Sequence, residues 1–357
     1  MTQLFTCWTA GVSAADAAQA GGKAAALGEL ARAGLPVPRG FVITTAAFLL
    51  HMDGVDPDGA ARGALEALAA DDLAGIARAA ADLRARVVAQ ALPPDVAVEI
   101  ASACAGLGDG LVAVRSSATP EDSAEASFAG LQDTYLAVRG TDAVLDRVRA
   151  CWASLYNDES IAYRRRQGTG EDGLAMGVVV QRMLNPRAAG VMFTRSPVTG
   201  DRSVVAIEGT WGLGSALVGG EVTPDSFTVS KVTGEITGRR VGVKLRVHSF
   251  TPNGQGISAT PMAVPLRRTP CLTDDEVRTL ARLGQQVEDH YGTPQDIEWA
   301  LLGDSPADLA DLADLADGFV LLQSRPETVW AARDREPIAC PQAKASDHVL
   351  ARFSRRL

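Results

Sequence analysis

The chain has 357 residues, of which 46% are hydrophobic, 22% charged and 5% aromatic, and its formal net charge is −9. This composition excludes a disordered chain, and the length predicts two domains or lobes, each large enough to bury its own core. No apolar run approaches the roughly 18 residues of a membrane helix, and residues 1–22 lack the basic and then apolar layout of a signal peptide, so we expect a cytoplasmic protein with no membrane contact.

The charge pattern also limits the partners of the chain. An acidic chain without a run of Lys and Arg is not expected to bind nucleic acid, because duplex binding needs several cations on one face. It can still bind a small polyanion through a few placed cations, backbone N–H groups and Mg²⁺. The five cysteines and four histidines are scattered, without a CxxC pair, which argues against a zinc site or a disulfide framework.

Helical periodicity dominates the first hundred residues, and short β-branched runs bounded by Gly, Pro and Asn follow. The predicted helices are 22–33, 61–70, 72–91 and 94–104. The predicted strands are 111–115, 134–138, 176–183, 190–194, 204–208, 226–231, 235–243, 296–302 and 319–324. A longer amphipathic helix is expected over Asp274–Tyr291, because Thr273 and Glu276 have the spacing of a capping box. The pattern predicts an α+β fold.

Two segments near the end have biased composition. Residues 307–317 are a tandem Asp-Leu-Ala repeat, which predicts a short acidic helix extending a hairpin turn. A polar tail follows Trp330 and ends in the basic amphipathic stretch 349–357, which can dock a partner or fray.

Two motifs in the first half have the chemistry of phosphate binding. Gly21 and Gly22 precede Lys23 at a helix start, where free N–H groups and a point charge can hold an anion. An ordinary flexible helix start with an exposed lysine is the alternative. The second motif places Arg115 at the end of a strand, before a loop of Ser, Ala, Gly and acidic residues that can fold over phosphates. A plain surface loop is the alternative there.

Two further motifs lie in the second half. Strand alternation puts Asp296 and Glu298 on one face and aligns Gln323 with Arg325. If the two strands pair, carboxylate and amide oxygens suited to Mg²⁺ lie beside a guanidinium suited to phosphate; two separate surface faces are the alternative. The Gly-rich turns within 189–225 would allow the backbone to pack closely beside a ligand. Ordinary β-turns without a ligand are the alternative.

Seven segments, taken together and in this order, resemble a known family: GGKAAALGEL, VAVRSSATPEDS, FAGLQDTYL, GVMFTRSP, VTPDSF, QDIEWA and QSRPET. They are similar to the N-terminal nucleotide-binding domain of the phosphoenolpyruvate synthase and pyruvate phosphate dikinase family, which rifampin phosphotransferase shares. The resemblance covers about residues 10–330. It implies an ATP-grasp fold with a nucleotide cleft between an N-terminal lobe at 1–183 and a C-terminal lobe at 184–330, and leaves 331–357 as the polar tail.

The resemblance implies roles for single residues in the binding of ATP. It implies that three cations bind the triphosphate and take part in catalysis, namely Lys23, Arg115 and Arg325. It implies a phosphate-covering loop at Gly130 and Thr134.

The remaining implied roles concern the base and the metal. Gln181 is expected to contact the adenine edge. Glu298 and Gln323 are the expected Mg²⁺ ligands with Asp296 as a helper, and Arg195 is expected to add to the phosphate site.

The chain also departs from the family pattern. Ser215 stands where the family often has the glutamate of Gly-Leu-Gly-Glu, so a role for that carboxylate is not expected here. None of the four histidines lies in a Gly-x-Thr-Cys-His segment, and the chain is too short for an acceptor-binding barrel. We therefore expect a separate subunit to supply the phosphohistidine and the acceptor domain.

The resulting hypothesis is a dikinase-type phosphotransferase with paired acceptors, which converts ATP to AMP and phosphate. Its layout resembles the ATP-binding subunits of phenylphosphate synthase and alkylphenol phosphate synthase, which act in aromatic degradation, so a phenolic hydroxyl is the expected small-molecule acceptor. A subunit of a pyruvate- or antibiotic-directed phosphotransferase is the first alternative. A non-catalytic nucleotide sensor of the same fold is the second, and a ligase that makes an acyl phosphate and ADP is the third.

Overall fold

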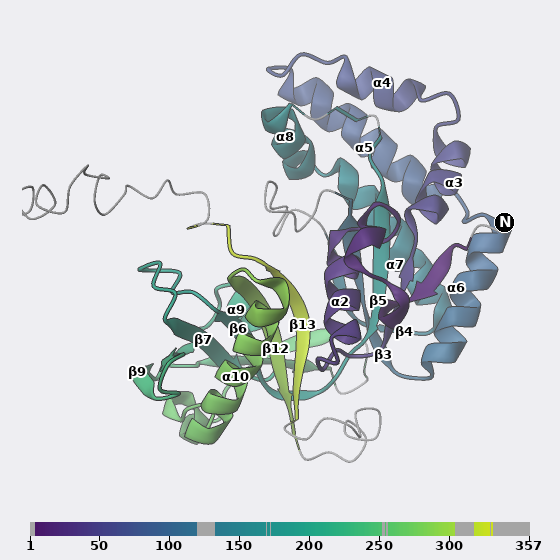
Figure 1. Ribbon diagram of the computed structural model, residues 1–357. Coiled ribbons are helices and arrows are strands. Elements are labelled where there is room, and N and C mark those ends of the chain that lie inside the picture. Colours follow the sequence, from purple (N-terminus) through teal and green to yellow (C-terminus); the bar gives the residue numbers. More distant parts are fainter. Residues whose placement is uncertain are drawn as a thin grey trace, which may run out of the picture. The chain divides into compact units, whose positions relative to one another are not determined.

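The computed structural model describes residues 4–119, 133–168, 170–171, 173–251, 254, 256–303, 318–328 and 330. The chain divides into two compact units, Met1–Glu327 and Thr328–Leu357. All the described helices and strands belong to the first unit (Figure 1). Helices and two separate large sheets make up this unit, which confirms the predicted α+β class. The Asp-Leu-Ala repeat, for which a short helix was predicted, and the basic stretch 349–357 lie outside the described residues.

The first sheet has five antiparallel strands in the order β1-β2-β5-β3-β4. Its strands are β1 (Thr6–Trp8), β2 (Gly40–Ile43), β3 (Leu111–Ala118), β4 (Thr134–Arg139) and β5 (Met176–Arg182). Helices cover both faces of the sheet, so β2 is buried along its whole length. Because helices shield both faces of the sheet from water, the sequences of β2 and most of β5 are continuously apolar and do not alternate between polar and apolar residues.

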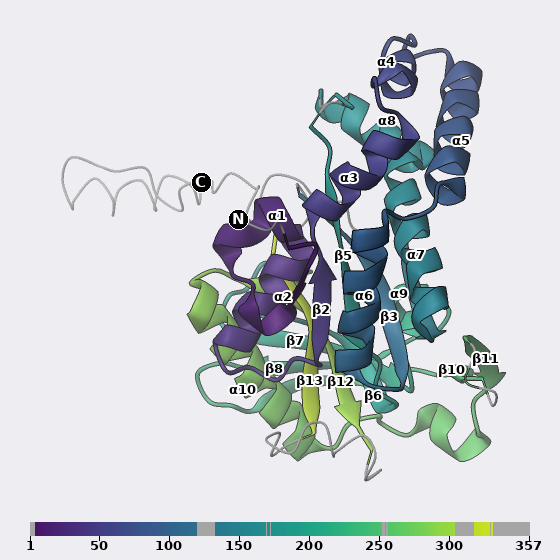
Figure 2. The ribbon, with the colours of Figure 1, turned by 90° about the vertical axis from the view of Figure 1, so that its right-hand side faces the viewer.

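Helices α3, α5, α6 and α7 pack on one face of the first sheet and α2 packs on the other (Figures 1 and 2). The helices up to this point of the chain are α1 (Ala17–Ala20), α2 (Gly22–Arg32), α3 (Thr45–Val55), α4 (Ala60–Glu66), α5 (Leu73–Ala89), α6 (Pro94–Leu107), α7 (Thr141–Ala153) and α8 (Asp158–Gln167). Short 3-10 turns are η1 (Thr9–Gly11), η2 (Ala14–Asp16) and η3 (Ser154–Tyr156). Fully buried Phe48 and Trp152 meet edge to face in the larger core.

The second sheet has six antiparallel strands in the order β13-β12-β6-β7-β8-β9. Its strands are β6 (Pro186–Phe193), β7 (Val204–Trp211), β8 (Asp225–Ser230), β9 (Ile236–Arg240), β12 (Gln295–Leu302) and β13 (Phe319–Pro326). A ribbon of β10 (Arg246–Phe250) and β11 (Ile257–Pro261), the short α9 (Ser215–Val218) and η4 (Val264–Arg268) lie in the connections. Helix α10 (Asp274–Tyr291) packs its apolar stripe on one face of this sheet, against Trp299 and Phe227.

Helix α2 belongs to the cores of both sheets. Ala24 and Leu27 pack with Val42 and Val179 of the first sheet, whereas Leu30 packs in the core of the second sheet. Just after the helix, the Pro36 carbonyl accepts a hydrogen bond of 2.7 Å from the N–H of Leu321 in β13. The helix therefore holds the first sheet and strand β13 together, with its N-terminus at the edge where β3 ends.

The described strands and helices include every element predicted within those residues. Asp274–Tyr291 matches α10 at both ends, and its capping box is present. The hairpin at residues 226–243 is formed by β8 and β9. The helix predicted over 61–70 ends earlier, at Glu66. Several described elements were not predicted, among them β1, α1, β2, α3, α7, α8, α9, β10 and β11. For example, β2 has only four residues, and α3 is apolar on most sides, which hides the helical period.

The capping box of α10 predicts a pH dependence of stability. Burial alone would raise the pKa of Glu276, but the Thr273 N–H and Arg187, both 2.7 Å from its carboxylate, outweigh burial and hold the pKa below its ordinary value of 4.5. The carboxylate therefore stabilises the fold above the unfolded pKa, and this contribution is lost as the pH falls through the lowered folded pKa. We expect Glu276→Gln to lower the free energy of unfolding by about 1 kcal/mol near neutral pH and by much less near pH ~3.

Urea unfolding of the Glu276→Gln variant at the two pH values measures this difference. Asp275→Asn, which changes an exposed carboxylate of the same helix turn, serves as the control and should have a small effect at both. An equal cost of Glu276→Gln at both pH values would show that the charge is not the origin of the stabilisation.

Among the described helices, no single one combines the length and apolarity that a membrane crossing requires. The bent pair α5 and α6 passes a test of length and composition when taken together. Both helices contribute side chains to the core of the first sheet.

Candidate functional site

Helix α2 begins beside the end of strand β3. Lys23 is 5% exposed, and its Nζ donates a hydrogen bond of 2.6 Å to the Ser116 carbonyl. The Ala24 N–H donates to Ser117 Oγ at 3.0 Å. Lys23 is therefore a buried cation fixed at the edge of the sheet rather than an exposed lysine on a flexible helix start.

Gly21 allows this close approach of helix and strand. Its φ of +82° and ψ of 160° lie in a region that essentially only glycine adopts. A Cβ at Gly21 would lie 1.9 Å from the Ser117 carbonyl oxygen. The backbone thus passes the strand at a distance that no other residue permits.

Substitution at Gly21 should therefore displace Lys23. We expect Gly21→Ala to cost about 1–3 kcal/mol in backbone strain alone, measured by chemical unfolding. It should also weaken binding of the nucleotide that the resemblance implies, measured by calorimetric titration. Gly34→Ala is the matched control, because Gly34 also has a positive φ of +73° but has open space where its Cβ would lie. It should lower stability by about 1 kcal/mol and leave binding unchanged, and equal effects of the two variants would contradict the role of crowding.

Arg115 in β3 reaches from the first sheet to the second. Its guanidinium Nη1 donates to the Leu322 carbonyl at 2.7 Å, and Nη2 donates to Gln323 Oε1 at 2.7 Å and to Glu298 Oε2 at 3.2 Å. Arg115 is 8% exposed. A single buried cation thus contacts the two strands β12 and β13 where the predicted carboxylate and amide lie.

The predicted pairing of the last two strands is confirmed. Glu298 lies directly opposite Gln323, and Asp296 lies opposite Arg325. The Glu298 and Gln323 oxygens converge on the same Arg115 nitrogen. A carboxylate and an amide oxygen that converge on one point are the donor types that Mg²⁺ takes in phosphate-binding sites, where substrate oxygens complete its shell, so these residues fit such an ion.

Arg325 and Asp296 form an ion pair next to Glu298. Arg325 donates to Asp296 Oδ2 from Nε at 2.9 Å and from Nη2 at 2.6 Å. Burial raises the pKa of Asp296 above its ordinary value, Arg325 opposes this change, and Glu298 and Glu327 add to it. Asp296 is thus a partner of the candidate phosphate-binding arginine, a contact that strand alternation alone did not specify.

Gln181, predicted to contact the adenine edge, lies in the middle of the first sheet. It is 3% exposed, and no described residue accepts a hydrogen bond from its Nε2. Its partners in register are the small residues Gly40 and Ala113. An unsatisfied buried amide nitrogen is costly, so this position has a donor available for an acceptor from outside the chain.

The other predicted residues lie at the margins of this group. Thr134 is exposed and pairs in register with Arg115, whereas Gly130 lies outside the described residues. Arg195 donates to the Gly200 carbonyl at 2.9 Å and lies 3.6 Å from Glu327.

One side-chain cluster was missed from the sequence. His248 is 7% exposed; its Nδ1 lies 2.9 Å from Ser215 Oγ and its Nε2 lies 3.3 Å from Glu221 Oε2. The three residues come from three different segments, and no local spacing signals their contact. Ser215 thus anchors strand β10 through His248 instead of presenting the carboxylate that the resemblance associates with its position.

Within the described residues, no group of three or more His, Cys, Asp or Glu side chains has the arrangement of a metal cluster. The four described cysteines are not joined in disulfides, and Cys340 lies outside the described residues. A metal at Glu298 and Gln323 would accordingly need oxygens from a bound ligand.

Comparison with known proteins adds to this geometry. The family model described as pyruvate phosphate dikinase, AMP/ATP-binding domain, matches residues 17–345. A rifampicin phosphotransferase from Streptomyces sp. is 44% identical over 320 residues, covering 89% of this chain and 35% of that protein. A probable phosphoenolpyruvate synthase from Methanothermobacter thermautotrophicus is 41% identical over 320 residues, covering 88% of this chain and 44% of that protein. The chain therefore spans less than half the length of these curated relatives.

Proposed function

Because the chain belongs to the family of the pyruvate phosphate dikinase AMP/ATP-binding domain, we propose that it is the ATP-binding part of a dikinase-type phosphotransferase. In this proposal the fold is an ATP-grasp fold, and the nucleotide binds between the first and second sheets, where Arg115 reaches from β3 to β12 and β13. The products are AMP and phosphate, and the terminal two phosphates pass first to a histidine.

The bridging contact of Arg115 is the observation on which the proposal depends. The buried guanidinium is held in place by the Leu322 carbonyl and the Gln323 amide, so it would stay in position when a phosphate replaces its contact with the Glu298 carboxylate. Lys23 at the start of α2 and Arg325 beside Asp296 are the further cations proposed to bind the phosphates. Positioning and charge neutralisation are the usual protein contributions to phosphoryl transfer.

Mg²⁺ is the proposed cofactor. Glu298 and Gln323 would hold it, and when bound it would neutralise charge on the phosphate oxygens. Glu298 and Asp296 place negative charge beside the arginines, so Arg115 and Arg325 would exchange contacts with these carboxylates for contacts with phosphate. Gln181 would donate its free Nε2–H to a nucleobase acceptor.

The phosphoryl-accepting histidine is proposed to come from a separate subunit. None of the four histidines here lies in a Gly-x-Thr-Cys-His segment, and His248 has both ring nitrogens engaged by Ser215 and Glu221. The final acceptor is proposed to be a small molecule with a phenolic hydroxyl. The names of the relatives favour a second candidate, in which the acceptor is an antibiotic or pyruvate.

The test combines this chain with a candidate subunit that carries a Gly-x-Thr-Cys-His segment. With ATP labelled with ³²P at the β-phosphate, we expect AMP to form and the label to appear on the histidine of that subunit, and Arg325→Ala to abolish both. Arg278→Ala, which removes an exposed arginine paired with Asp275, is the control and should change neither. Unchanged labelling with Arg325→Ala would contradict the role of this residue.

The alternatives have different outcomes in the same experiment. ADP in place of AMP would indicate a ligase that makes an acyl phosphate. Binding of ATP without turnover, with the subunit and each acceptor present, would indicate a nucleotide sensor. Comparing phenol, pyruvate and rifampicin as acceptors by the rate of AMP formation then identifies the acceptor class.

A further inference from the structure

The second sheet carries an acidic residue, Glu208 of β7, to which the resemblance assigns no role. We call the face of this sheet opposite α10 the inner face; it includes Glu298 and Gln323, which Arg115 contacts. Residues directly opposite each other in paired strands have side chains on the same face. Glu298 lies opposite Val191, and Val191 lies opposite Glu208. Glu208 is therefore also on the inner face, two strands and about 10 Å from Glu298.

The burial of β7 agrees with this orientation. Val205 and Ile207 belong to the core that α10 covers, so strand alternation places Glu208 on the other face. Glu208 is half-buried. Within the described ranges, no side chain forms an ion pair or a hydrogen bond with its carboxylate. A half-buried carboxylate without a donor is costly, which favours a ligand that supplies donors.

The inner face has three rows of register partners that run from β13 to β7. The rows are Arg325, Asp296, Phe193 and Ala206; then Gln323, Glu298, Val191 and Glu208; and then Val320, Ala300, Ala189 and Thr210. The first row contains the candidate phosphate-binding arginine and the second the candidate metal ligands. Glu208 is the β7 member of the middle row.

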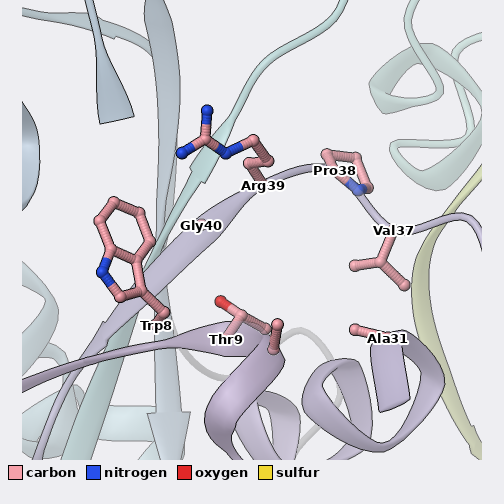
Figure 3. A pocket seen from close by; sticks show the side chains of 8 residues that line it. Trp8, Thr9, Ala31, Val37, Pro38, Arg39 and Gly40 are labelled. Carbon is pink, nitrogen blue, oxygen red and sulfur yellow. The ribbon is translucent and has the colours of Figure 1, made fainter. Parts of the chain in front are cut away.

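The first sheet shows which end of these rows faces the nucleobase. Gln181 is the candidate base contact, and its register partner Gly40 lies beside Thr9 in the wall of a separate pocket of about 360 Å³ (Figure 3). Three residues after Gln181, Leu184 packs with Ala189 and Ala300 of the third row. The base end of the cleft is therefore on the side of the third row.

The phosphate end lies in the other direction along the first sheet. Arg115 contacts the middle row. The next residue of β3, Ser116, accepts the hydrogen bond of Lys23, and Arg325 is in the first row. A nucleotide with its base at Gln181 and its terminal phosphates at Lys23 and Arg325 has its ribose at the level of the middle row.

We propose that Glu208 binds the ribose of the nucleotide and makes the site specific for ribonucleotides over deoxyribonucleotides. This inference rests on the proposed function, from which it takes the nucleotide. The two carboxylate oxygens accept hydrogen bonds from the 2′- and 3′-hydroxyl groups. Half-buried Val191 separates Glu208 from Glu298 and contacts the carbon atoms of the sugar. A phosphate does not suit this position, because no described cation is paired with Glu208.

Calorimetric titration of the full chain with ADP, 2′-deoxy-ADP and 3′-deoxy-ADP, each with Mg²⁺, tests the proposal. We expect ADP to bind about tenfold more tightly than either deoxynucleotide, because each of these lacks one charge-assisted hydrogen bond. Glu208→Ala should weaken ADP binding at least about tenfold and bring its affinity close to those of the deoxynucleotides. Glu208→Gln, which keeps one acceptor oxygen, should give an intermediate preference.

Glu235→Ala is the control for the change of net charge. Glu235 is an exposed carboxylate of the same sheet, in the turn between β8 and β9. This variant should leave the affinity for ADP and the preference for ribose unchanged. Thermal unfolding checks that all variants are folded.

Three results would overturn the role of Glu208. Equal binding of ADP and the deoxynucleotides by the unmodified chain would show that the ribose hydroxyl groups are not recognised. An equal loss of all three affinities in Glu208→Ala would indicate a role in the fold or in binding metal and phosphate. A gain for all three would show that Glu208 only repels phosphate. If the unmodified chain bound neither ADP nor ATP, the proposed function itself would be contradicted, together with this role.

Discussion

Replacing Arg115 by methionine should reduce ATP affinity at least about a hundredfold and abolish phosphoryl transfer. The expected loss corresponds to two charge-assisted hydrogen bonds to phosphate, each worth about 1.5–3 kcal/mol. The same change should lower the free energy of unfolding by about 2–4 kcal/mol, because the Leu322 carbonyl and the buried amide of Gln323 lose their donor. Calorimetric titration with Mg-ATP and urea unfolding measure the two effects separately.

Two further variants make the Arg115 result interpretable. Arg115→Lys keeps the positive charge but loses the planar guanidinium with its several N–H donors. It should therefore recover part of the ATP affinity and little of the contact with β12 and β13. Arg165→Met is the matched control, because Arg165 also donates to two backbone carbonyls, those of Leu65 and Leu68, at a distance from the site. ATP binding that survives Arg115→Met while stability falls would mean that Arg115 only joins the sheets.

Replacing Lys244 by methionine should give the largest loss of stability in the second sheet, about 3–5 kcal/mol. Lys244 and Asp225 form an ion pair in which both side chains are fully buried. Asp225 also accepts hydrogen bonds from the N–H groups of Gly242 at 2.9 Å and Cys271 at 2.7 Å. Removal of the lysine leaves an uncompensated buried carboxylate that holds two loops.

Urea unfolding of Lys244→Met measures this cost. Arg278→Met breaks the exposed pair of Arg278 with Asp275 and should cost less than about 1 kcal/mol. The double variant Asp225→Asn/Lys244→Met should cost clearly less than the sum of the single variants, because the two residues are in contact. A loss of under about 1 kcal/mol for Lys244→Met would contradict a structural role of the pair.

Local patterns were sufficient to predict most strands and helices, because each pattern reports burial on one side of an element. The alternation of Asp296 and Glu298 against Ile297 and Trp299 is an example, since the apolar pair is fully buried and the acidic pair is not. Local motifs made Lys23 and Arg325 candidates for phosphate binding, but only the resemblance to a family assigned them, together with Gln181, to a common ligand.

Contacts between distant segments could not be predicted in this way. The approach of Arg115 to Leu322 joins residues that are 207 positions apart, and it depends on how α2 and β13 pack. The contact of Ser215 with His248 likewise depends on where β10 returns to the second sheet. No period or spacing in the sequence encodes such distances, because they arise from the packing of complete elements.

The two-sided packing of α2 has a consequence for how this protein unfolds. Leu30 is part of the core of the second sheet, while Leu27, one turn earlier, is part of the core of the first. Cutting the chain between residues 183 and 184 would thus separate the second sheet from a side chain in its own interior. The two sheets should melt in one cooperative transition, and neither half of the chain should fold when it is expressed alone.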